Sequence, residues 1–512
     1  MTKNLSYSNL AMSDLSPEPE VAARQQPLKS YLKKMTVEPV LFLCIASAVI
    51  KFVILPQFML NSICQRDFST SVCSNLTSPA NTGKQAQVQS TTAKWMLALY
   101  SVSLSISLCT VPLLGSFADA FGSKSALLFQ LVMFDLQSIT YVVLSWKSVQ
   151  PAYLFICISL GGLSGDIVGV TMLTCSYLSR ITTEEDRTFR LTLLDGIISL
   201  SLCIFTFISG FVITAFGFSA SYLFSFGFDT IALLWLIILV KNDVVGQKSE
   251  NDKEEQLKDS ANDKDKDIET DTSQNRVHET SKQTSMSRLR SSLNEFHPVK
   301  HFKQLNVILR EQGDSRVILA LLTALFLSTI CLVGESLILV LYITNQPYNM
   351  SPVDVGYLLS LQGLLRFVAG GVILNVLIQR FLKWSDINIG MAFFGLGSIY
   401  FILLGSATSS QMLFGIQILN IFGPLVSPTL RSVVTKKGGP QNYGTILSVA
   451  LSMDAVASIV ATVIVHTTYS SLVVQSPGAF CYILAAISCL GILPSFLAKR
   501  LSKDSGEDSA IK

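Results

Sequence analysis

The sequence has few charged residues. Of its 512 residues, 14% are Asp, Glu, Lys or Arg, whereas a soluble domain carries about 25%. Half of the chain is hydrophobic, and the mean hydropathy is +0.49. The formal net charge is only +3, and no basic tract is interleaved with aromatic residues, so nothing favours nucleic-acid binding. The composition indicates a protein embedded in a lipid bilayer.

The sequence also lacks the motifs of several kinds of chemistry. It has four histidines, and no group of Cys and His residues has the spacing of a metal site. It contains no phosphate-binding loop and no nucleophile elbow. These absences argue against an enzyme, an ATP-driven pump, a metal centre and an organic cofactor. Residues 1–35 are polar and carry no apolar core with a cleavage site, which indicates a cytosolic tail rather than a signal peptide.

Apolar segments of about 20 residues, the length of a membrane-spanning helix, recur through the chain. The sequence therefore predicts an all-α membrane protein with twelve transmembrane helices in two six-helix bundles, 36–241 and 316–498. Residues 242–315 form a charged cytosolic linker, and 499–512 a C-terminal tail. The expected spans are 39–60, 95–114, 125–146, 151–173, 190–214, 219–241, 316–343, 353–378, 386–406, 410–433, 443–468 and 478–498. Bundles of this build face each other across a central cavity in transporters.

Basic residues in short connections indicate the orientation of the chain in the membrane. They gather on the side that also carries the linker, which favours both termini in the cytosol of a plasma-membrane, lysosomal or endosomal protein. These residues are Lys124, Arg180, Arg187, Arg190, Arg380, Lys383, Arg431, Lys436 and Lys437.

The longest outer connection, residues 57–94, has two features of an exported segment. It contains a glycosylation sequon at Asn75. It also holds Cys64 and Cys73, which could form a local disulfide if the loop faces an oxidising space. The sequence alone does not decide whether these two cysteines pair.

Two acidic residues, Asp166 and Asp195, lie inside the fourth and fifth apolar spans. An ionisable group in hydrocarbon costs a few kcal/mol or more, so such residues usually line a pathway or form a pair. A buried carboxylate that takes up a proton on one side of the membrane and releases it on the other can couple proton movement to transport. The alternative is that each acid only pairs with a basic residue on a neighbouring helix.

Basic residues also occur inside the spans. Lys51 and Arg366 would attract an anion, because carboxylates and phosphates need positive partners in a low dielectric. The alternative is an internal ion pair, such as Lys51 with Asp229 or with Asp454, since an unpaired central charge is costly. Both interpretations remain open from the sequence.

The connection between the second and third spans, residues 115–127, contains Gly115, Asp119, Gly122 and Lys124. The glycines allow close helix approach and a tight turn. This segment resembles the loop signature of the major facilitator superfamily, although Ser123 replaces the usual first basic residue. The resemblance implies a role in gating between helices.

Further segments resemble solute carrier family 46, to which the proton-coupled folate transporter belongs. The resemblance is carried by Val37-Glu38-Pro39, Gly165-Asp166, Arg187-Thr-Phe-Arg190 with Asp195, Gly334 with Ile338-Leu339, Leu341-Tyr342, and Pro428 with Arg431. It implies proton coupling at Asp195 with support from Asp166, and conformational cycling or substrate handling at Asp119 and Arg431. The family's histidine in span seven, near Leu332, is absent here. Glu335, one turn away, is the candidate substitute.

The sequence therefore predicts a secondary active transporter. It would move a small organic anion together with protons, which are its only coupling ion, and would work in the bilayer as a monomer. The competing interpretation is a non-transporting membrane sensor built on a carrier scaffold. Substrate counterflow in proteoliposomes separates the two, because a sensor binds without net flux.

Overall fold

The computed structural model describes residues 36–146, 150–182, 184–242, 315–368, 386–437 and 439–504. All regular structure within these ranges is helical, which confirms the predicted all-α fold. The described residues from Val37 onward form one compact unit. The expectations for the N-terminal tail, the linker and the end of the C-terminal tail concern residues outside the described ranges.

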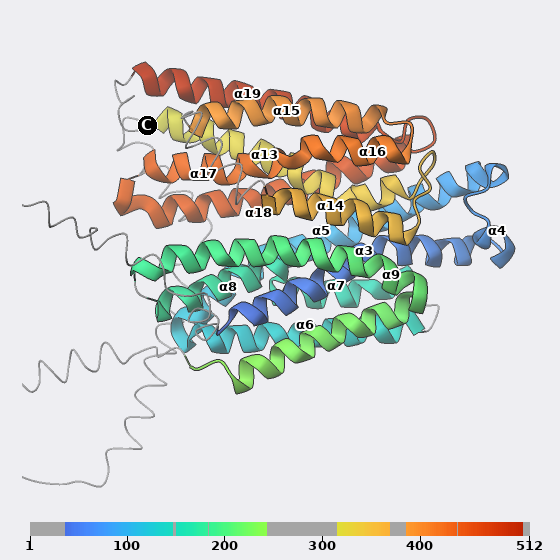
Figure 1. The fold of residues 1–512 in the computed structure, drawn as a ribbon, viewed down its shortest axis with the longest axis horizontal. Coiled ribbons are helices and arrows are strands. Elements are labelled where there is room, and N and C mark those ends of the chain that lie inside the picture. The colour runs from blue at the N-terminus through green and yellow to red at the C-terminus, as the bar shows by residue number, and fades with distance from the viewer. Residues whose placement is uncertain are drawn as a thin grey trace, which may run out of the picture. The chain divides into compact units, whose positions relative to one another are not determined.

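The N-half, as we call residues 37–242, consists of long helices joined by short connections (Figure 1). In chain order these are α3 (Glu38–Asp67), α4 (Thr70–Ser74), η1 (Pro79–Asn81), α5 (Thr82–Phe121), α6 (Ser123–Trp146), η2 (Pro151–Tyr153), α7 (Leu154–Ser164), α8 (Asp166–Ile181) and α9 (Glu184–Ile238). Helix α9 has one non-helical residue, Gly217, at φ 77°, a conformation that glycine adopts without strain. The chain reverses direction there, so α9 contains both the fifth and the sixth expected span (Figure 1).

The C-half, residues 315–504, repeats this design with more interruptions. Its elements are α13 (Ser315–Ile343), α14 (Pro352–Val368), α15 (Asp386–Ser406), α16 (Ser410–Gln417), η4 (Ile418–Ile421), η5 (Gly423–Leu425), α17 (Val426–Lys437), α18 (Gly439–Leu472) and α19 (Ala479–Asp504). Ten helices of the described chain are long and apolar enough to cross a membrane. One of them, Gly196–Ile238, includes the reversal at Gly217, and α14 is described only as far as Val368. The count of twelve spans stays a prediction.

Two expected spans are not continuous helices. The fourth is broken at Gly165, which has φ 78° and separates α7 from α8. The tenth passes through two short 3₁₀ segments between α16 and α17, where Pro424 lacks the amide proton that an α-helix would use. In a membrane, such breaks are tolerated only where protein or water satisfies the freed backbone groups. Both breaks therefore mark places where polar chemistry is possible.

Each half has its own buried apolar core. One cluster of buried side chains, from Val37 to Val240, draws only on the N-half. Two further clusters draw on the C-half, and Val53 and Ala93 are the N-half residues that join one of them. Most of the buried apolar contacts therefore lie within one half or the other.

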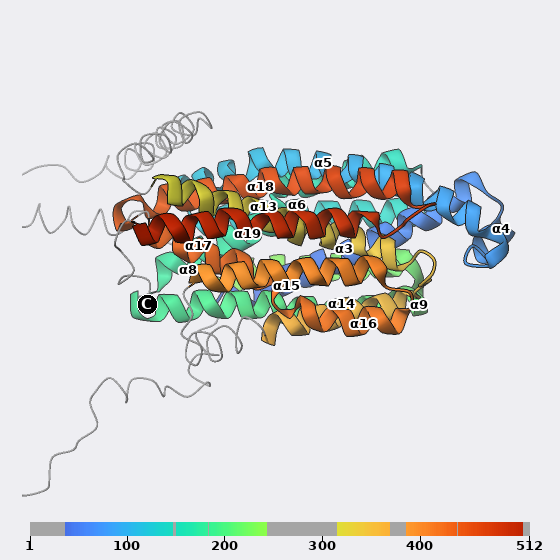
Figure 2. The same ribbon diagram turned by 90° about the horizontal axis from the view of Figure 1, so that it is seen from above.

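The two halves meet along two helix pairs. Helix α14 lies along α9 (Figure 1), and α18 lies along α5 (Figure 2). Glycines permit the close approach of α9 and α14: a Cβ atom on Gly210 would lie 2.4 Å from the carbonyl oxygen of Pro352, and one on Gly363 would lie 2.8 Å from the backbone nitrogen of Cys203. Small residues commonly allow helices in membranes to pack this closely.

Hydrogen bonds also cross between the halves near the disulfide end, by which we mean the end that carries Cys64 and Cys73. The Nε2 atom of Gln85 donates to Oδ1 of Asn349 at 2.8 Å, and the Ser90 hydroxyl donates to the carbonyl of Ser470 at 2.6 Å. The Tyr469 hydroxyl donates to Gln89 at 3.3 Å. These bonds hold the two halves together at this end of the bundle.

Replacing Gly210 by alanine should destabilise the protein, because the new methyl group would collide with the backbone of the other half. We expect a loss of about 1–3 kcal/mol, typical of overpacking, measured by thermal unfolding in detergent. Gly227→Ala, in the same helix but with no atom within 4 Å of its added Cβ, is the matched control and should be neutral or slightly stabilising. Equal stability of the two variants would contradict the close packing of α9 on α14.

Candidate functional site

The N-half contains a buried ion pair between Lys51 on α3 and Asp229 on α9. Lys51 Nζ lies 3.1 Å from Oδ2 of Asp229, and the side chains are 8% and 0% exposed. Lys51 also donates to Ser138 at 3.1 Å and to Gln137 at 3.3 Å. Oδ2 of Asp229 further accepts from Ser47 at 2.7 Å and from Ser138 at 2.6 Å. The ammonium group of Lys51 therefore has three acceptors inside its own half, which favours the internal pair over a substrate contact.

A comparable set of contacts lies in the C-half. Arg431 on α17 forms an ion pair with Asp454 on α18, and Asp454 Oδ1 also accepts from Thr329 on α13 at 2.5 Å. Asp454 thus pairs with Arg431 rather than with Lys51. These contacts tie three helices of the C-half together.

Two ion pairs lie at the linker end, where α9 ends and α13 begins. Arg190 Nη2 lies 2.5 Å from Oε1 of Glu38 and joins α9 to the start of α3. Near the connection between α5 and α6, Arg180 on α8 lies 2.7 Å from Asp119 on α5. Gly122 turns the chain at φ 92°, and Lys124 donates to the carbonyl of Val240 at 2.5 Å. Gly115 lies next to Met172: a Cβ atom added to Gly115 would lie 3.8 Å from the Met172 side chain. The loop signature therefore joins α5, α8 and the end of α9.

The pair of Glu38 and Arg190 was not singled out from the sequence. Both residues stood in the segments that carry the family resemblance, but no pattern in the chain matches two residues 152 positions apart.

The two acids of spans four and five are placed differently. Asp166 begins α8, directly after the break at Gly165, and has φ 52°. Its side chain is exposed, and Oδ1 accepts from the backbone amide of Ile167 at 2.8 Å. Asp195 lies on α9, five residues after Arg190, and its side chain is outside the described part of the structure.

Glu335 lies at the centre of a buried polar cluster in the C-half. Its side chain is 1% exposed. Oε1 accepts three hydrogen bonds, from Gln362 on α14 at 2.7 Å, from Tyr400 on α15 at 2.7 Å, and from Asn420 in η4 at 2.9 Å. All three partners are neutral. Sequence reasoning selected Glu335 but none of these partners, because isolated Gln, Tyr and Asn residues in apolar spans carry no distinctive pattern.

A small cavity adjoins this cluster. It is lined by Glu335 and Cys331 of α13, Tyr400 of α15, Asn420 of η4 and Ser488 of α19, among others, and its volume is about 30 Å³. That is enough for at least one water molecule, which needs roughly 10–15 Å³ of such volume and a few polar partners. The carboxyl group of Glu335 therefore has a polar cavity beside it inside the C-half.

Arg366 follows Gln362 by one helical turn on α14, so both residues lie on the same side of that helix. Gln362 in turn donates to Glu335, so Arg366 lies one helical turn from a hydrogen-bond partner of that carboxyl group. Arg366 lies roughly 20 Å along the helix from Pro352 at the disulfide end, which places it near the middle of a span. Its Nε and Nη2 atoms are buried, and neither has a hydrogen-bond partner among the described residues.

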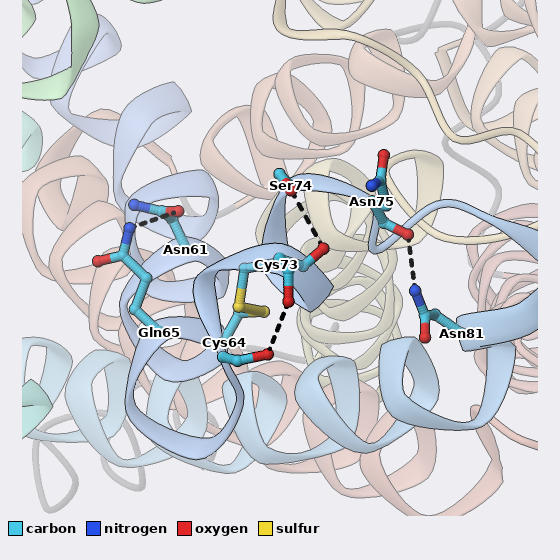
Figure 3. Close-up of a disulfide and its surroundings, with 9 residues drawn as sticks. Asn61, Cys64, Gln65, Cys73, Ser74, Asn75 and Asn81 are labelled. Carbon is cyan, nitrogen blue, oxygen red and sulfur yellow. Dashed lines mark hydrogen bonds between the residues drawn. A yellow bond between two sulfur atoms is a disulfide. The ribbon is translucent and has the colours of Figure 1, made fainter.

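The outer connection is closed by a disulfide between Cys64 and Cys73 (Figure 3). Asn75 follows it, with an exposed side chain, and its backbone carbonyl accepts from Nδ2 of Asn81 at 2.9 Å. The sequon is thus accessible on a segment that the disulfide holds in place. No group of three or more His, Cys, Asp or Glu side chains in the described ranges could hold a metal ion.

Substituting Lys51 alone should be far more harmful than removing the whole pair. Lys51→Met leaves the buried charge of Asp229 without a partner, which costs about 3–5 kcal/mol. The double variant Lys51→Met/Asp229→Asn should recover most of this loss, as measured by thermal unfolding in detergent, and should still transport. A double variant that is stable but transports nothing would instead make Lys51 a substrate ligand.

Comparisons with known proteins agree with this architecture. Residues 21–462 match the model of the Major Facilitator Superfamily. Over 193 residues the chain is 23% identical to the proton-coupled folate transporter of Bos taurus. That alignment covers 37% of this chain and 42% of the relative, so the chain matches less than half the length of that protein.

Solved structures share the fold at low sequence identity. The human organic anion transporter MFSD10 (TETRAN) has a TM-score of 0.55 and 17% identity, over 92% of this chain and all of that one. A D-xylose-proton symporter has a TM-score of 0.60 and 13% identity, over 93% and 98% of the two chains. A peptide transporter in complex with sulfate also reaches 0.60, with 13% identity over 91% and 94%. The chain belongs to the major facilitator superfamily of membrane transporters.

Proposed function

We propose that this transporter carries an organic anion together with a proton, and that Glu335 is the residue that binds the proton. One observation carries the proposal: the carboxyl group of Glu335 is 1% exposed and accepts hydrogen bonds from three neutral donors, one of which, Gln362, lies one helical turn from Arg366 on α14. A buried acid with these surroundings can exist both with and without its proton.

Acids that form ion pairs in the described part of the chain are less suited to this role. Asp229, Asp454, Asp119 and Glu38 each lie within hydrogen-bond distance of a Lys or Arg side chain. Protonating such an acid leaves its basic partner uncompensated, which is costly when the pair is buried. Glu335 has no ion pair among the described side chains, and its three hydrogen-bond donors are neutral, so proton uptake by Glu335 breaks no direct ion pair.

Both protonation states of Glu335 keep their hydrogen bonds. In the charged state, Oε1 accepts from Gln362, Tyr400 and Asn420, and bonds to a charged acceptor are the stronger kind. Oε1 has no lone pair left for a proton, so the proton would bind Oε2 and leave all three bonds in place. A water molecule in the adjoining cavity could deliver or remove that proton.

Asp166 and Asp195 belong to the same proposal as steps on the proton's route. Asp166 lies exposed at the break between α7 and α8, and Asp195 lies on α9 near the linker end. The family resemblance assigns proton coupling to these positions. In our proposal they exchange protons with the cytosol, while Glu335 holds the proton during the conformational change.

The known relatives support the two parts of this proposal separately. The bovine relative is named a proton-coupled folate transporter, and one structural neighbour is named an organic anion transporter. Arg366 supplies the positive charge that an anion needs in a low dielectric. Transport of a solute rather than enzymatic catalysis is the role that these similarities favour, with protons as the coupling ion.

Glu335→Gln should abolish accumulation driven by a pH gradient but retain substrate counterflow. Glutamine keeps a carbonyl acceptor for the three donors but cannot take up a proton. With one proton per anion, a gradient of one pH unit supports about tenfold accumulation, and the variant should show none. The measurement is uptake of radiolabelled folate, hippurate and estrone sulfate into proteoliposomes, with and without the gradient.

Three further variants make this result interpretable. Asp67→Asn, which removes an exposed acid outside the cluster, should behave like the wild type. Asp166→Asn and Asp195→Asn should slow uptake without abolishing accumulation. If Asp195→Asn abolishes accumulation while Glu335→Gln retains it, the proton is carried by Asp195 and the role of Glu335 is structural.

We further propose that the disulfide end faces the outside of the cell or the lumen of a lysosome or endosome, with both termini in the cytosol. A disulfide persists in those oxidising spaces, and each of them can be acidic relative to the cytosol. All sites named above lie within a single chain, so a monomer suffices for transport.

The sequon at Asn75 tests this orientation. Asn75 is exposed, so the protein expressed in mammalian cells should carry one N-glycan there, and Asn75→Gln should run at lower apparent mass on a gel. Treatment of the wild type with a glycosidase should give the same shift. A wild-type protein that never shifts, together with a Cys64 that alkylates readily in the cytosol of intact cells, would reverse the orientation.

A further inference from the structure

Arg366 has an unusual hydrogen-bonding state. A guanidinium group offers five N–H donors, and a buried donor without an acceptor costs roughly 1–3 kcal/mol, more for a charged group. The Nε and Nη2 atoms of Arg366 are both buried and both lack a partner in the described chain. The side chain as a whole is only partly buried, so a solute that binds these two atoms has to displace the groups that cover them.

The two unpartnered atoms form one edge of the guanidinium group. Their N–H bonds run nearly parallel, which matches the spacing of the two oxygens of a carboxylate and gives two charge-assisted hydrogen bonds. A lysine has no such edge, because its ammonium group is a point charge. The free edge of Arg366 thus has the shape of a carboxylate-binding site.

We propose that the Nε and Nη2 edge of Arg366 binds the carboxylate of the transported solute, and that this carboxylate and the charge of Glu335 exclude each other. The proposal rests on the function proposed above and names the substrate class: monocarboxylates, or solutes with one carboxylate available for this contact. Gln362, one helical turn before Arg366 on α14, donates to Glu335, and in our proposal the solute binds the Nε and Nη2 edge of Arg366.

The solute carboxylate and the charged form of Glu335 exclude each other because of the net charge of the site. In the empty state, Arg366 and Glu335 together are neutral. A bound carboxylate would add a second negative charge next to a single buried positive one, and uncompensated charge at this depth is expensive. Protonation of Glu335 at Oε2 restores neutrality. The proton comes from the acidic side with the solute and leaves Glu335 when the solute departs.

Other titratable groups near Glu335 do not supply the positive charge that a bound carboxylate would otherwise need. They are Tyr400 on α15, Cys331 on α13 and Cys481 on α19, all neutral in their ordinary protonation states. Helix α18 faces Gly334, next to Glu335, with Val465 and Ala461. Toward α17, Asp454 is already paired with Arg431. Helix α3 contributes the apolar Val53 to the same core. Helix α9 passes α14 at Phe367, where a Cβ atom on Gly196 would lie 3.8 Å from the ring, and Asp195 precedes that glycine with its side chain outside the described part of the structure. Among the side chains that the structure describes, the charge balance is set by Arg366, Glu335 and the solute.

The test measures equilibrium binding to the full-length protein in nanodiscs at acidic and neutral pH. The probes are radiolabelled folate and hippurate as carboxylates, hippuramide as the uncharged analogue of hippurate, and estrone sulfate as an anion without a carboxylate. In the wild type, at least one carboxylate should bind up to tenfold more tightly for each pH unit of acidification, and hippuramide should not bind.

The variants separate the charge of Arg366 from its shape. Arg366→Lys keeps the charge that balances Glu335, so it should fold, yet bind carboxylates at least about tenfold more weakly. Glu335→Gln should bind carboxylates as tightly at neutral pH as the wild type does at acidic pH. The double variant Arg366→Gln/Glu335→Gln removes both charges and should bind no carboxylate at either pH. Arg316→Gln, an exposed arginine on α13, is the control and should match the wild type.

The outcomes separate this inference from the proposed function. If Arg366→Lys binds carboxylates like the wild type, or if no carboxylate binds the wild type at all, the carboxylate site is wrong. Proton-driven uptake of estrone sulfate in that case would leave the proposed symport standing. If carboxylates bind through Arg366 with no dependence on pH or on Glu335, the site stands but the exclusion between solute and Glu335 fails.

Discussion

The cost of burying charge in a membrane protein governs where the polar residues of this chain lie. A charged side chain inside the bilayer needs a partner, because neither lipid nor apolar side chains can solvate it. Lys51 and Asp229 meet this need with a direct ion pair and several hydroxyl groups. Glu335 meets it with three neutral donors. The guanidinium edge of Arg366 has two buried nitrogen atoms without a hydrogen-bond partner among the described residues, which is why we propose that it binds the solute.

The contacts within each half differ in kind from the contacts between the two halves. Every ion pair between described side chains joins two groups of the same half. The described hydrogen bonds between halves are neutral, and those near the disulfide end involve Gln85, Gln89 and Ser90 of α5. Charged bonds are about twice as strong as neutral ones. Each half is thus braced internally and joined to the other by contacts that separate more easily, as the rocking motion of such transporters requires.

Much of this organisation was predictable from the sequence because it depends on local pattern. Long apolar segments indicated the helices, and the nine-residue spacing of Cys64 and Cys73 made a local disulfide possible. What the sequence could not supply was the partner of each buried charge. Lys51 could pair with Asp229 or Asp454, since helical periodicity defines a face but not the neighbour that it meets. The partners of Glu335 were missed for the same reason, because Gln362, Tyr400 and Asn420 come from three separate elements.

The breaks in the fourth and tenth spans could not be foreseen from hydropathy, which averages over a short interruption. Gly165 with Asp166 and the segment around Pro424 interrupt otherwise apolar stretches. Their positions make physical sense in the finished fold. Asp166 lies at the first break. Asn420, which donates a hydrogen bond to Glu335, lies in η4 at the second break. Helix interruptions therefore bring polar groups to the depth where the proposed chemistry takes place.

A glutamate at position 335 has a consequence that the histidine of the family resemblance would not have. A histidine beside Arg366 would make the site positive when empty and doubly positive when protonated. Glu335 makes it neutral when empty and singly positive when protonated. Under the proposed scheme, protonation therefore creates one positive charge where none existed, which one carboxylate neutralises. The identity of this residue favours a solute that presents a single negative charge to Arg366, and it ties proton uptake to binding more strictly than a permanently positive site would.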